Sequence, residues 1–327
     1  MKIAVINVTN SGEIITEKLR DNLDIDFYPR ELIKELGIKE IAKRAMEKYK
    51  AVVFISSTGI AVRAIAEYIR GKDKDPAVIV IDSCGNFVIS LLSGHLGGAN
   101  ELTERIAEIL GSTAVITTAT DNLGVVAPDM IAKNNGLVID SLKNAKEIAA
   151  LLVDNKRVAF LDPKGRISVP KGYTSELEDI DGLVFIDHSL KDKYKSMKIP
   201  VLKLIRKDIV LGIGCRKNFD TEKMKENIVD LLKDKNLDER AVKTIATVEV
   251  KKDEEAILKL AEYFHCELKI FSLDEIKKVH NKYEGSDFVE KTIGVRAVSE
   301  PCVELLGAKL ITDKIKVNGM TVCIGEI

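Results

Sequence analysis

Residues 93–100 place a histidine among glycines, between the apolar stretch 87–92 and the helical pattern 102–110. A strand should therefore pass into a helix here. Glycine lets the backbone bend sharply and approach a ligand closely, and the first N–H groups of a helix attract negative charge. The segment could thus bind a carboxylate or phosphate beside His95, which can carry a proton. A tight turn whose glycines serve packing alone is the alternative, and the segment by itself favours neither. The candidate binding residues are Gly94, Gly97, Gly98 and Asn100.

A second junction follows the apolar run 51–55, where small residues precede a helical pattern. Hydroxyl and backbone N–H groups there could hold an anion, with a cation one turn into the helix. A plain helix cap is the alternative and is favoured for this element taken alone. Because the carboxyl ends of parallel strands meet at one edge of a sheet, we expect the first two junctions to lie close together. The candidates here are Ser57, Thr58, Gly59 and Arg63, and the end of the strand 114–116 adds Thr117, Thr118 and Asp121.

A comparable junction lies in the C-terminal third, between the strand-like run 208–213 and a helix at 221–233. Its candidates are Gly212, Gly214, Cys215 and Arg216. Lys217 stands where a dinucleotide-binding G-x-G-x-x-G would have its third glycine, so that fingerprint is not supported. Beside a cation and a helix start, the pKa of Cys215 could be lowered; a buried structural thiol is the commoner alternative.

The length of 327 residues exceeds one ordinary core and predicts two or three domains. Strand and helix patterns alternate up to residue 128 and again over 207–327, whereas 129–206 has short apolar runs between charged turns. We therefore expect an α/β fold: two α/β domains with mainly parallel sheets, joined by a small α/β middle segment. The pair Asn318–Gly319, between two apolar runs, predicts a β-hairpin near the end of the chain.

The composition argues against several classes of function. The net charge is −1, tryptophan is absent and aromatic residues make up 5%, so neither a basic field nor base-stacking platforms indicate nucleic acid. Five dispersed cysteines lack the spacing of a zinc site and are typical of a reducing cytoplasm. No apolar run approaches the ~20 residues that span a bilayer, and the first residues are too short for a signal peptide. We expect a cytoplasmic protein that binds no metal of its own.

Several motifs resemble the CbiG family of cobalamin-biosynthesis proteins. STGIAVR (57–63), the run 75–100 ending in SGHLGGAN, and ITTATD (116–121) are similar to the N-terminal part of that family. GIGCR (212–216), ATVEVK (246–251) and VSE (298–300) resemble its C-terminal part, which some organisms have alone as CobE-like proteins. The motifs are long and in order, and the resemblance covers nearly the whole chain, with the middle region matched poorly.

The resemblance implies a cobalt-precorrin-5A hydrolase of anaerobic cobalamin synthesis, acting on a carbon–carbon bond. The implied substrate is a cobalt-containing tetrapyrrole with a δ-lactone on ring A. Water opens the lactone, and a two-carbon fragment then leaves as acetaldehyde. No cofactor is implied, because the cobalt belongs to the substrate. The expected partners are cobalt-precorrin-5A and other enzymes of the cobalamin pathway, with no nucleic acid and no membrane; a homodimer is left open.

Roles for the candidates follow from that implied chemistry. His95 is the candidate base, and Asp121 is a second proton acceptor. Backbone N–H groups of 94–98 or 57–59 would hold the oxyanion. Arg63, Arg216 and Lys251 would pair with carboxylates of the macrocycle, and Glu300 would pair with one of those cations. We expect the reaction to take place in a cleft between the two α/β domains.

Two other functions compete with the hydrolase. A non-catalytic carrier of corrinoid intermediates would bind the macrocycle but release no acetaldehyde. A nucleotide-binding transferase would use the glycine turns for phosphates. The lack of a G-K-[ST] phosphate loop and of a complete dinucleotide fingerprint argues against the transferase.

Overall fold

The computed structural model describes residues 2–71 and 74–327 and contains two compact units. Unit 1 comprises Met1–Lys133 with the short pieces Leu152–Asp154 and Pro170–Gly172. Unit 2 comprises Asn134–Leu151, Asn155–Val169 and Tyr173–Ile327, and it contains two sheets. The division of the sequence into 1–128, 129–206 and 207–327 stays a prediction.

Unit 1 is built on a six-stranded sheet in the order β2-β1-β3-β4-β5-β6. The central strands β1, β3 and β4 are apolar and buried along their whole length, as expected for parallel strands covered on both faces. β2, β1, β3 and β4 are parallel, whereas β5 runs antiparallel to β4, and β6 is parallel to β5. The strands are β1 (Ile3–Asn7), β2 (Ile25–Tyr28), β3 (Ala51–Ile55), β4 (Ala77–Ile81), β5 (Phe87–Leu92) and β6 (Thr113–Val115).

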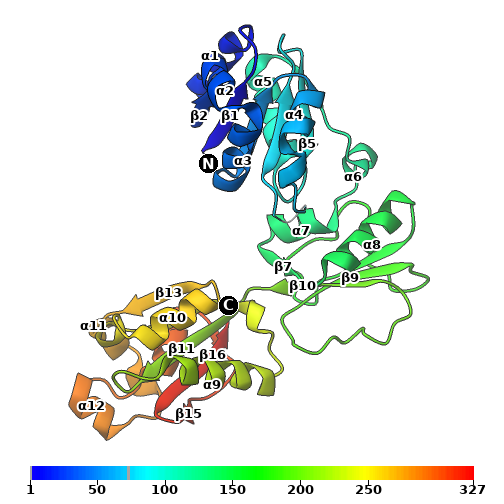
Figure 1. Cartoon of the computed structure of the whole chain (residues 1–327). Helices are drawn as coiled ribbons and strands as arrows, with labels where there is room; N and C mark the ends of the chain where they lie inside the picture. The colour runs from blue at the N-terminus through cyan, green and yellow to red at the C-terminus, as the bar shows by residue number, and fades with distance from the viewer. Residues whose placement is uncertain (1, 72–73) are drawn as a thin grey trace. The chain divides into compact units, whose positions relative to one another are not determined.

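Helices cover both faces of this sheet (Figure 1). On one face, α1 and α5 pack through residues such as Leu19 and Ile106. On the other face, α3 and α4 pack through residues such as Ile41 and Ile65. Two short helices, α6 and α7, follow the last strand. The helices of unit 1 are α1 (Gly12–Asn22), α2 (Arg30–Leu36), α3 (Ile38–Lys48), α4 (Thr58–Ile65), α5 (Ala99–Leu110), α6 (Ala119–Leu123) and α7 (Pro128–Asn134), with η1 (Ala66–Tyr68).

The first sheet of unit 2 has four strands in the order β7-β10-β9-β8. β8, β9 and β10 are parallel, and β7 is antiparallel to β10. Four short apolar runs of the middle segment therefore form one sheet, accompanied by the helix α8 (Leu142–Val153). The strands are β7 (Leu137–Ile139), β8 (Val158–Leu161), β9 (Gly182–Asp187) and β10 (Val201–Arg206).

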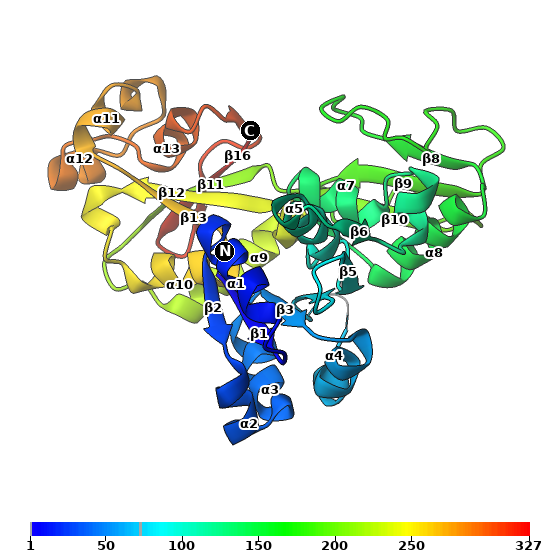
Figure 2. The same cartoon turned by 90° about the horizontal axis from the view of Figure 1, so that it is seen from above.

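The second sheet of unit 2 follows the order β13-β12-β11-β16-β14, with β15 paired to β16. β11, β12 and β13 are parallel, and β16 is antiparallel to β11. Figure 2 shows this sheet between α9 and α10 on one side and α11 and α13 on the other. The strands are β11 (Ile209–Cys215), β12 (Val242–Val248), β13 (Glu267–Phe271), β14 (Lys309–Leu310), β15 (Ile315–Val317) and β16 (Met320–Glu326). The helices are α9 (Thr221–Asp234), α10 (Glu255–Tyr263), α11 (Leu273–Lys277), α12 (Asp287–Ile293) and α13 (Ser299–Leu305), with η2 (Glu239–Ala241), η3 (Glu249–Lys251) and η4 (His280–Lys282).

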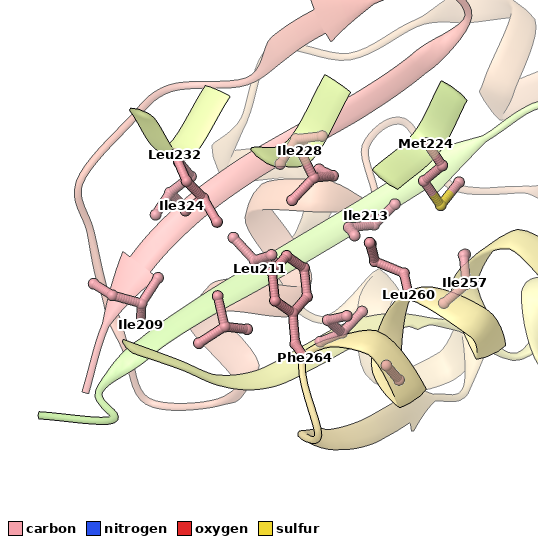
Figure 3. Packing of buried hydrophobic residues seen from close by; sticks show 14 of the residues in the cluster. Ile209, Leu211, Ile213, Met224, Ile228, Leu232, Ile257, Leu260, Phe264 and Ile324 are labelled. Atoms are coloured by element: carbon pink, nitrogen blue, oxygen red, sulfur yellow. The ribbon is translucent and has the colours of Figure 1, made fainter. Parts of the chain in front are cut away.

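The larger core of unit 2 lies between this sheet and the helices α9 and α10. Figure 3 shows Leu211 and Ile213 of β11 facing Ile228 of α9 and Leu260 of α10. These side chains are essentially inaccessible to solvent. Each buried aliphatic side chain of this size contributes about 1.5–3 kcal/mol, so this packing fixes the position of the loop that leaves β11.

The fold confirms the expected α/β class with mixed, mostly parallel sheets. The predicted hairpin is also confirmed: Asn318 and Gly319 both have positive φ values, 49° and 90°, and connect β15 to β16. The apolar run before the turn forms two strands, because Lys309–Leu310 pairs with the far end of β16 and Ile315–Val317 pairs with its start. No helix of the described residues is both long enough and apolar enough to cross a bilayer.

Candidate functional site

The loop between β5 and α5 holds His95 in unit 1. Its tight path uses left-handed backbone at Ser93 (φ 58°) and Gly98 (φ 83°). A Cβ on Gly94 would lie 2.7 Å from Oδ1 of Asn100, and one on Gly97 would lie 2.4 Å from Cβ of Ser93. The glycines are therefore needed for close packing within the loop.

Most N–H groups at the start of α5 are already bonded inside this loop. Gly98 donates to the carbonyl of His95, Ala99 to that of Ser93, and Asn100 to that of Gly94. The helix start thus satisfies itself and is a weaker anion site than the sequence predicts. Among the described residues, no acceptor is bonded to the N–H of Leu96 or Gly97, so these two donors remain for an oxyanion.

Two carboxylates flank the imidazole of His95. Nε2 lies 3.1 Å from Oδ2 of Asp121 on α6, and Nδ1 lies 3.7 Å from Oδ2 of Asp129 on α7. Thr120 Oγ1 lies 3.3 Å from Nε2. Asp129, followed by Asp121, raises the pKa of His95, and partial burial of the ring opposes the rise without cancelling it. The pair of carboxylates favours the imidazolium form, with a proton on each nitrogen.

One oxygen of Asp121 contacts three polar side chains. Its Oδ2 accepts a 2.7 Å hydrogen bond from Nδ2 of Asn100 and another from the hydroxyl of Thr118, besides facing His95. Asn100 also donates to Oγ1 of Thr118 at 2.9 Å and accepts from Ser90 at 2.6 Å. The structure therefore brings together four residues that the sequence predicts for the site: His95, Asn100, Thr118 and Asp121. Thr117 is exposed next to this cluster.

A lysine completes the cluster. Nζ of Lys133, on α7, donates a 3.2 Å hydrogen bond to the carbonyl of His95 and lies 3.9 Å from a carboxylate oxygen of Glu101. Lys133 and Asp129 are one helical turn apart, so α7 presents a cation and an anion to the same loop. The cluster thus brings the His95 imidazole, two carboxylates and the Lys133 ammonium group together at the β5–α5 loop.

The junction after β3 does not lie beside His95, and the expectation that the two junctions share an edge is wrong. β5 is antiparallel to β4: Ile81 pairs with Val88, and Val78 pairs with Leu92. The carboxyl end of β5 therefore lies at the edge where β3 and β4 begin. Ser57, Thr58, Gly59 and Arg63 lie at the opposite edge, about five residues of strand away, or roughly 17 Å.

The local contacts at that opposite edge are those of a helix start. Ser57 is the N-cap residue of α4, but within the described chain its side chain makes no capping hydrogen bond. Arg63 donates from its guanidinium to the carbonyl of Gly59 at 3.1 Å, within the same helix. Neither contact is the side-chain cap that the alternative interpretation of this junction expected.

The junction after β11 opens into a cavity of about 1470 Å³ in unit 2. Gly214, Cys215 and Arg216 line it, as does Lys251, so the structure brings together four more of the predicted residues. Burial raises the pKa of the Cys215 thiol to about 11, although Lys251 acts in the opposite direction. Cys215 is therefore a neutral thiol near pH 7, and the lowered pKa considered from the sequence is wrong.

Gly212 and Glu300 are not among the residues that line this cavity. A Cβ on Gly212 would lie 1.9 Å from the carbonyl oxygen of Ser299, so this glycine lets α13 pack against β11. Glu300 is buried; it accepts a 2.8 Å hydrogen bond from Ser299 Oγ and lies 3.7 Å from Nζ of Lys314. The cation beside Glu300 is thus Lys314, which does line the cavity.

Family models match three consecutive parts of the chain. "Cobalamin synthesis G N-terminal" matches residues 40–121, "Cobalamin biosynthesis central region" matches 126–199, and "Cobalamin synthesis G C-terminus" matches 209–325. A protein of Salmonella typhimurium named cobalt-precorrin-5A hydrolase is 33% identical over 99% of this chain and 97% of that protein. The chain belongs to the CbiG family.

Other similar proteins carry related names. A cobalt-precorrin-5A hydrolase of Priestia megaterium is 32% identical over 82% of this CbiG-family chain and 76% of that protein. The crystal structure of a putative cobalamin biosynthesis protein G homolog from Sulfolobus solfataricus is 25% identical, with a TM-score of 0.42, over 99% of this chain and 97% of that one.

Sequence reasoning missed several polar groups of this CbiG-family chain. Asp129 directly follows Pro128, and a proline with an acidic neighbour at the first turn is a common helix start. In the sequence, Pro128 and Asp129 therefore indicate the start of a helix, and nothing marks Asp129 as a partner of His95. Lys133 and Lys314 lie in helix and loop patterns rich in charge, where nothing distinguishes them from solvated residues.

Proposed function

We propose that this protein opens the ring A δ-lactone of cobalt-precorrin-5A with water and releases acetaldehyde, giving cobalt-precorrin-5B. The observation that carries the proposal is the near full-length similarity to proteins named cobalt-precorrin-5A hydrolase. The cluster around His95 supports it, because it supplies groups that donate and accept protons within one loop region.

The first step needs a proton acceptor for water and a proton donor for the departing oxygen. Asp121 is the acceptor in this proposal: among the described residues none donates a hydrogen bond to its Oδ1, and its side chain is 44% exposed. Water attacks the lactone carbonyl carbon as Asp121 takes its proton. The N–H groups of Leu96 and Gly97 face the developing oxyanion.

The carbon–oxygen bond of the lactone then breaks, and the His95 imidazolium gives its proton to the alkoxide. Asp121 then releases its proton to solvent and His95 takes one from solvent, which restores both groups; the 44% exposure of the Asp121 side chain allows this exchange. The products are a carboxylic acid and an alcohol, so the elements of one water molecule are accounted for. The sequence analysis predicted that His95 acts as the base; in this proposal His95 is the acid and Asp121 is the base.

The second step removes the two-carbon fragment. The hydroxyl proton passes to Asp121, the carbon–oxygen bond becomes a carbonyl, and acetaldehyde leaves. The electron pair of the broken carbon–carbon bond stays on the macrocycle, whose carbon takes a proton from His95. Asp121 and His95 therefore act in both steps, first when the carbon–oxygen bond of the lactone breaks and then when the carbon–carbon bond breaks.

A His95→Gln variant tests this proposal with cobalt-precorrin-5A as substrate. Loss of a positioned acid or base lowers the rate by about 10²–10⁴-fold, measured as acetaldehyde release. His265→Asn is the matched control, because His265 is exposed in unit 2 and has a left-handed backbone that asparagine tolerates. A variant that releases acetaldehyde at the wild-type rate would remove His95 from the mechanism. Macrocycle binding by the wild-type protein without acetaldehyde release would support a carrier instead.

A further inference from the structure

The cavity at the junction after β11 is large for a small-molecule site. Ligand pockets are usually about 300–1,000 Å³, and this one has a volume of about 1470 Å³. We propose that it binds the carboxylate-bearing rim of a corrinoid macrocycle through side-chain cations. This inference rests on the proposed function for the identity of the ligand, and it assigns the binding of that ligand to unit 2.

Three of the cations that line the cavity have no carboxylate partner among the described residues: Arg216, Lys217 and Lys316. Arg216 is nevertheless held in place. Its backbone N–H donates a 3.2 Å hydrogen bond to the carbonyl of Gly319, and its guanidinium carbon lies 5.8 Å from the ring centre of Phe219. Lys316 lies on β15, in the hairpin whose turn contains Gly319. The positioned guanidinium of Arg216 and the ammonium groups of Lys217 and Lys316 are well suited to binding carboxylates.

Three further cations of the lining have acidic neighbours. Lys251 lies 3.1 Å from Glu254, Lys314 lies 3.7 Å from Glu300, and Arg296 lies 3.7 Å from Glu290. The side chains of Lys251 and Lys314 are only 16% and 10% exposed, and each already lies near a buried carboxylate. Most of the positive charge available to a ligand therefore comes from Arg216, Lys217 and Lys316.

The acidic residues of the lining are fewer than the cations. Asp220 accepts the N–H of Lys223 as the cap of α9, and Glu254 accepts the N–H of Phe219 at 2.8 Å. Asp253 and Glu255 are exposed at the same cavity. Because a carboxylate already occupies the start of α9, a phosphate would be repelled from this helix N-terminus. We therefore assign anion binding in this cavity to side chains and not to the start of α9.

Apolar side chains also line the cavity. Val248 lies at the end of β12, Val298 lies just before α13, and Val317 ends β15. A ligand that fits this lining has a broad apolar surface and several carboxylates on its edge. A corrinoid precursor with its acetate and propionate side chains has both features. A nucleotide has a smaller apolar surface and carries phosphates in place of carboxylates.

A pair of probes separates carboxylate recognition from apolar packing. Dicyanocobyrinic acid carries seven free carboxylates, and its heptamethyl ester has the same ring without the charges. We expect calorimetric titration to show binding of the acid that is at least tenfold tighter than binding of the ester. Binding of the acid should weaken as the salt concentration rises, because exposed cations are screened.

The double variant Arg216→Gln, Lys316→Gln tests the residues. It should bind the acid at least tenfold more weakly and leave binding of the ester unchanged. Lys252→Gln is the control: Lys252 is exposed next to Lys251 but does not line the cavity. Equal affinity of the double variant and the wild type for the acid would overturn the assignment. Acetaldehyde release by that variant at the wild-type KM would overturn it too, while leaving the hydrolase proposal intact.

Discussion

Asp129 Oδ2 lies 3.7 Å from Nδ1 of His95, on the other side of the ring from Asp121. The side chain of Asp129 is only 11% exposed, so its negative charge acts on the imidazole with little screening by solvent. His95 has a carboxylate near each nitrogen, which favours the protonated ring that the proposed mechanism uses as an acid.

The first prediction concerns the pH dependence of the reaction. Asp129 raises the pKa of His95, so the protonated form persists to higher pH than for an ordinary histidine. Activity that needs this proton is present at low pH and is lost as the pH rises through the raised pKa. Asp129→Asn removes the largest cause of the shift, and the alkaline limb of kcat/KM should move to lower pH. A proton NMR titration of His95 should show the same displacement.

Glu101→Gln is a control for that experiment, because Glu101 lies near Lys133 and not near the ring of His95. Its alkaline limb should stay close to that of the wild type. An Asp129→Asn profile that coincides with the wild type would mean that Asp129 has no influence on the titrating group. A limb displaced to higher pH would contradict the assignment of His95 as the acid.

The second prediction concerns Cys215. Its thiol has a pKa of about 11, so less than about one part in a thousand is thiolate at pH 7.5. Cys215→Ala should retain acetaldehyde release within about twofold, and iodoacetamide should modify Cys215 far more slowly than exposed Cys84. Peptide mass spectrometry after timed alkylation measures both rates. Rapid modification of Cys215 at neutral pH would show that its environment stabilises the thiolate.

The third prediction separates the two edges of the sheet in unit 1. Arg63 lies at the carboxyl end of β3, whereas His95 follows the carboxyl end of the antiparallel strand β5. Arg63→Gln should therefore leave kcat within about twofold of the wild type, whereas Asp121→Asn should lower it by about 10²-fold or more. Comparable losses of kcat in the two variants would mean that both edges take part in the chemical step.

The direction of β5 explains why the sequence analysis wrongly placed the junctions after β3 and β5 at the same edge of the sheet. Residues 77–81 and 87–92 are both apolar and β-branched, which suits parallel and antiparallel strands alike. The five residues between them are, however, too few for the crossover that joins parallel strands, so the length of this connection was a signal for an antiparallel hairpin that the prediction did not use. Strand patterns report burial and not direction. The Asn318–Gly319 pair was predictable because the two residues must adopt positive φ values, which few others tolerate.

Contacts between distant elements were the least predictable part of the site. The glycine loop around His95 is visible in the sequence, and so is Asp121 at the end of a strand pattern. The approach of Asp129 depends on how α7 packs after residue 128, which no local pattern specifies. Likewise, Arg216 is prominent in its motif, but Lys316, which lines the same cavity, comes from a hairpin about a hundred residues later.

The fourth prediction tests whether Gly212 is structural. A Cβ there would lie 1.9 Å from the carbonyl oxygen of Ser299 and 3.0 Å from a methyl carbon of Val303, so Gly212→Ala must displace α13. Overpacking of this kind typically costs about 1–3 kcal/mol of unfolding free energy. Gly59→Ala is the matched control: its nearest neighbour is the mobile guanidinium of Arg63, and alanine favours a helix by up to about 1 kcal/mol. Urea titrations should therefore move the midpoint down for Gly212→Ala and leave it unchanged or higher for Gly59→Ala. Equal midpoints for Gly212→Ala and the wild type would show that α13 can yield without cost, and the glycine would then need another explanation.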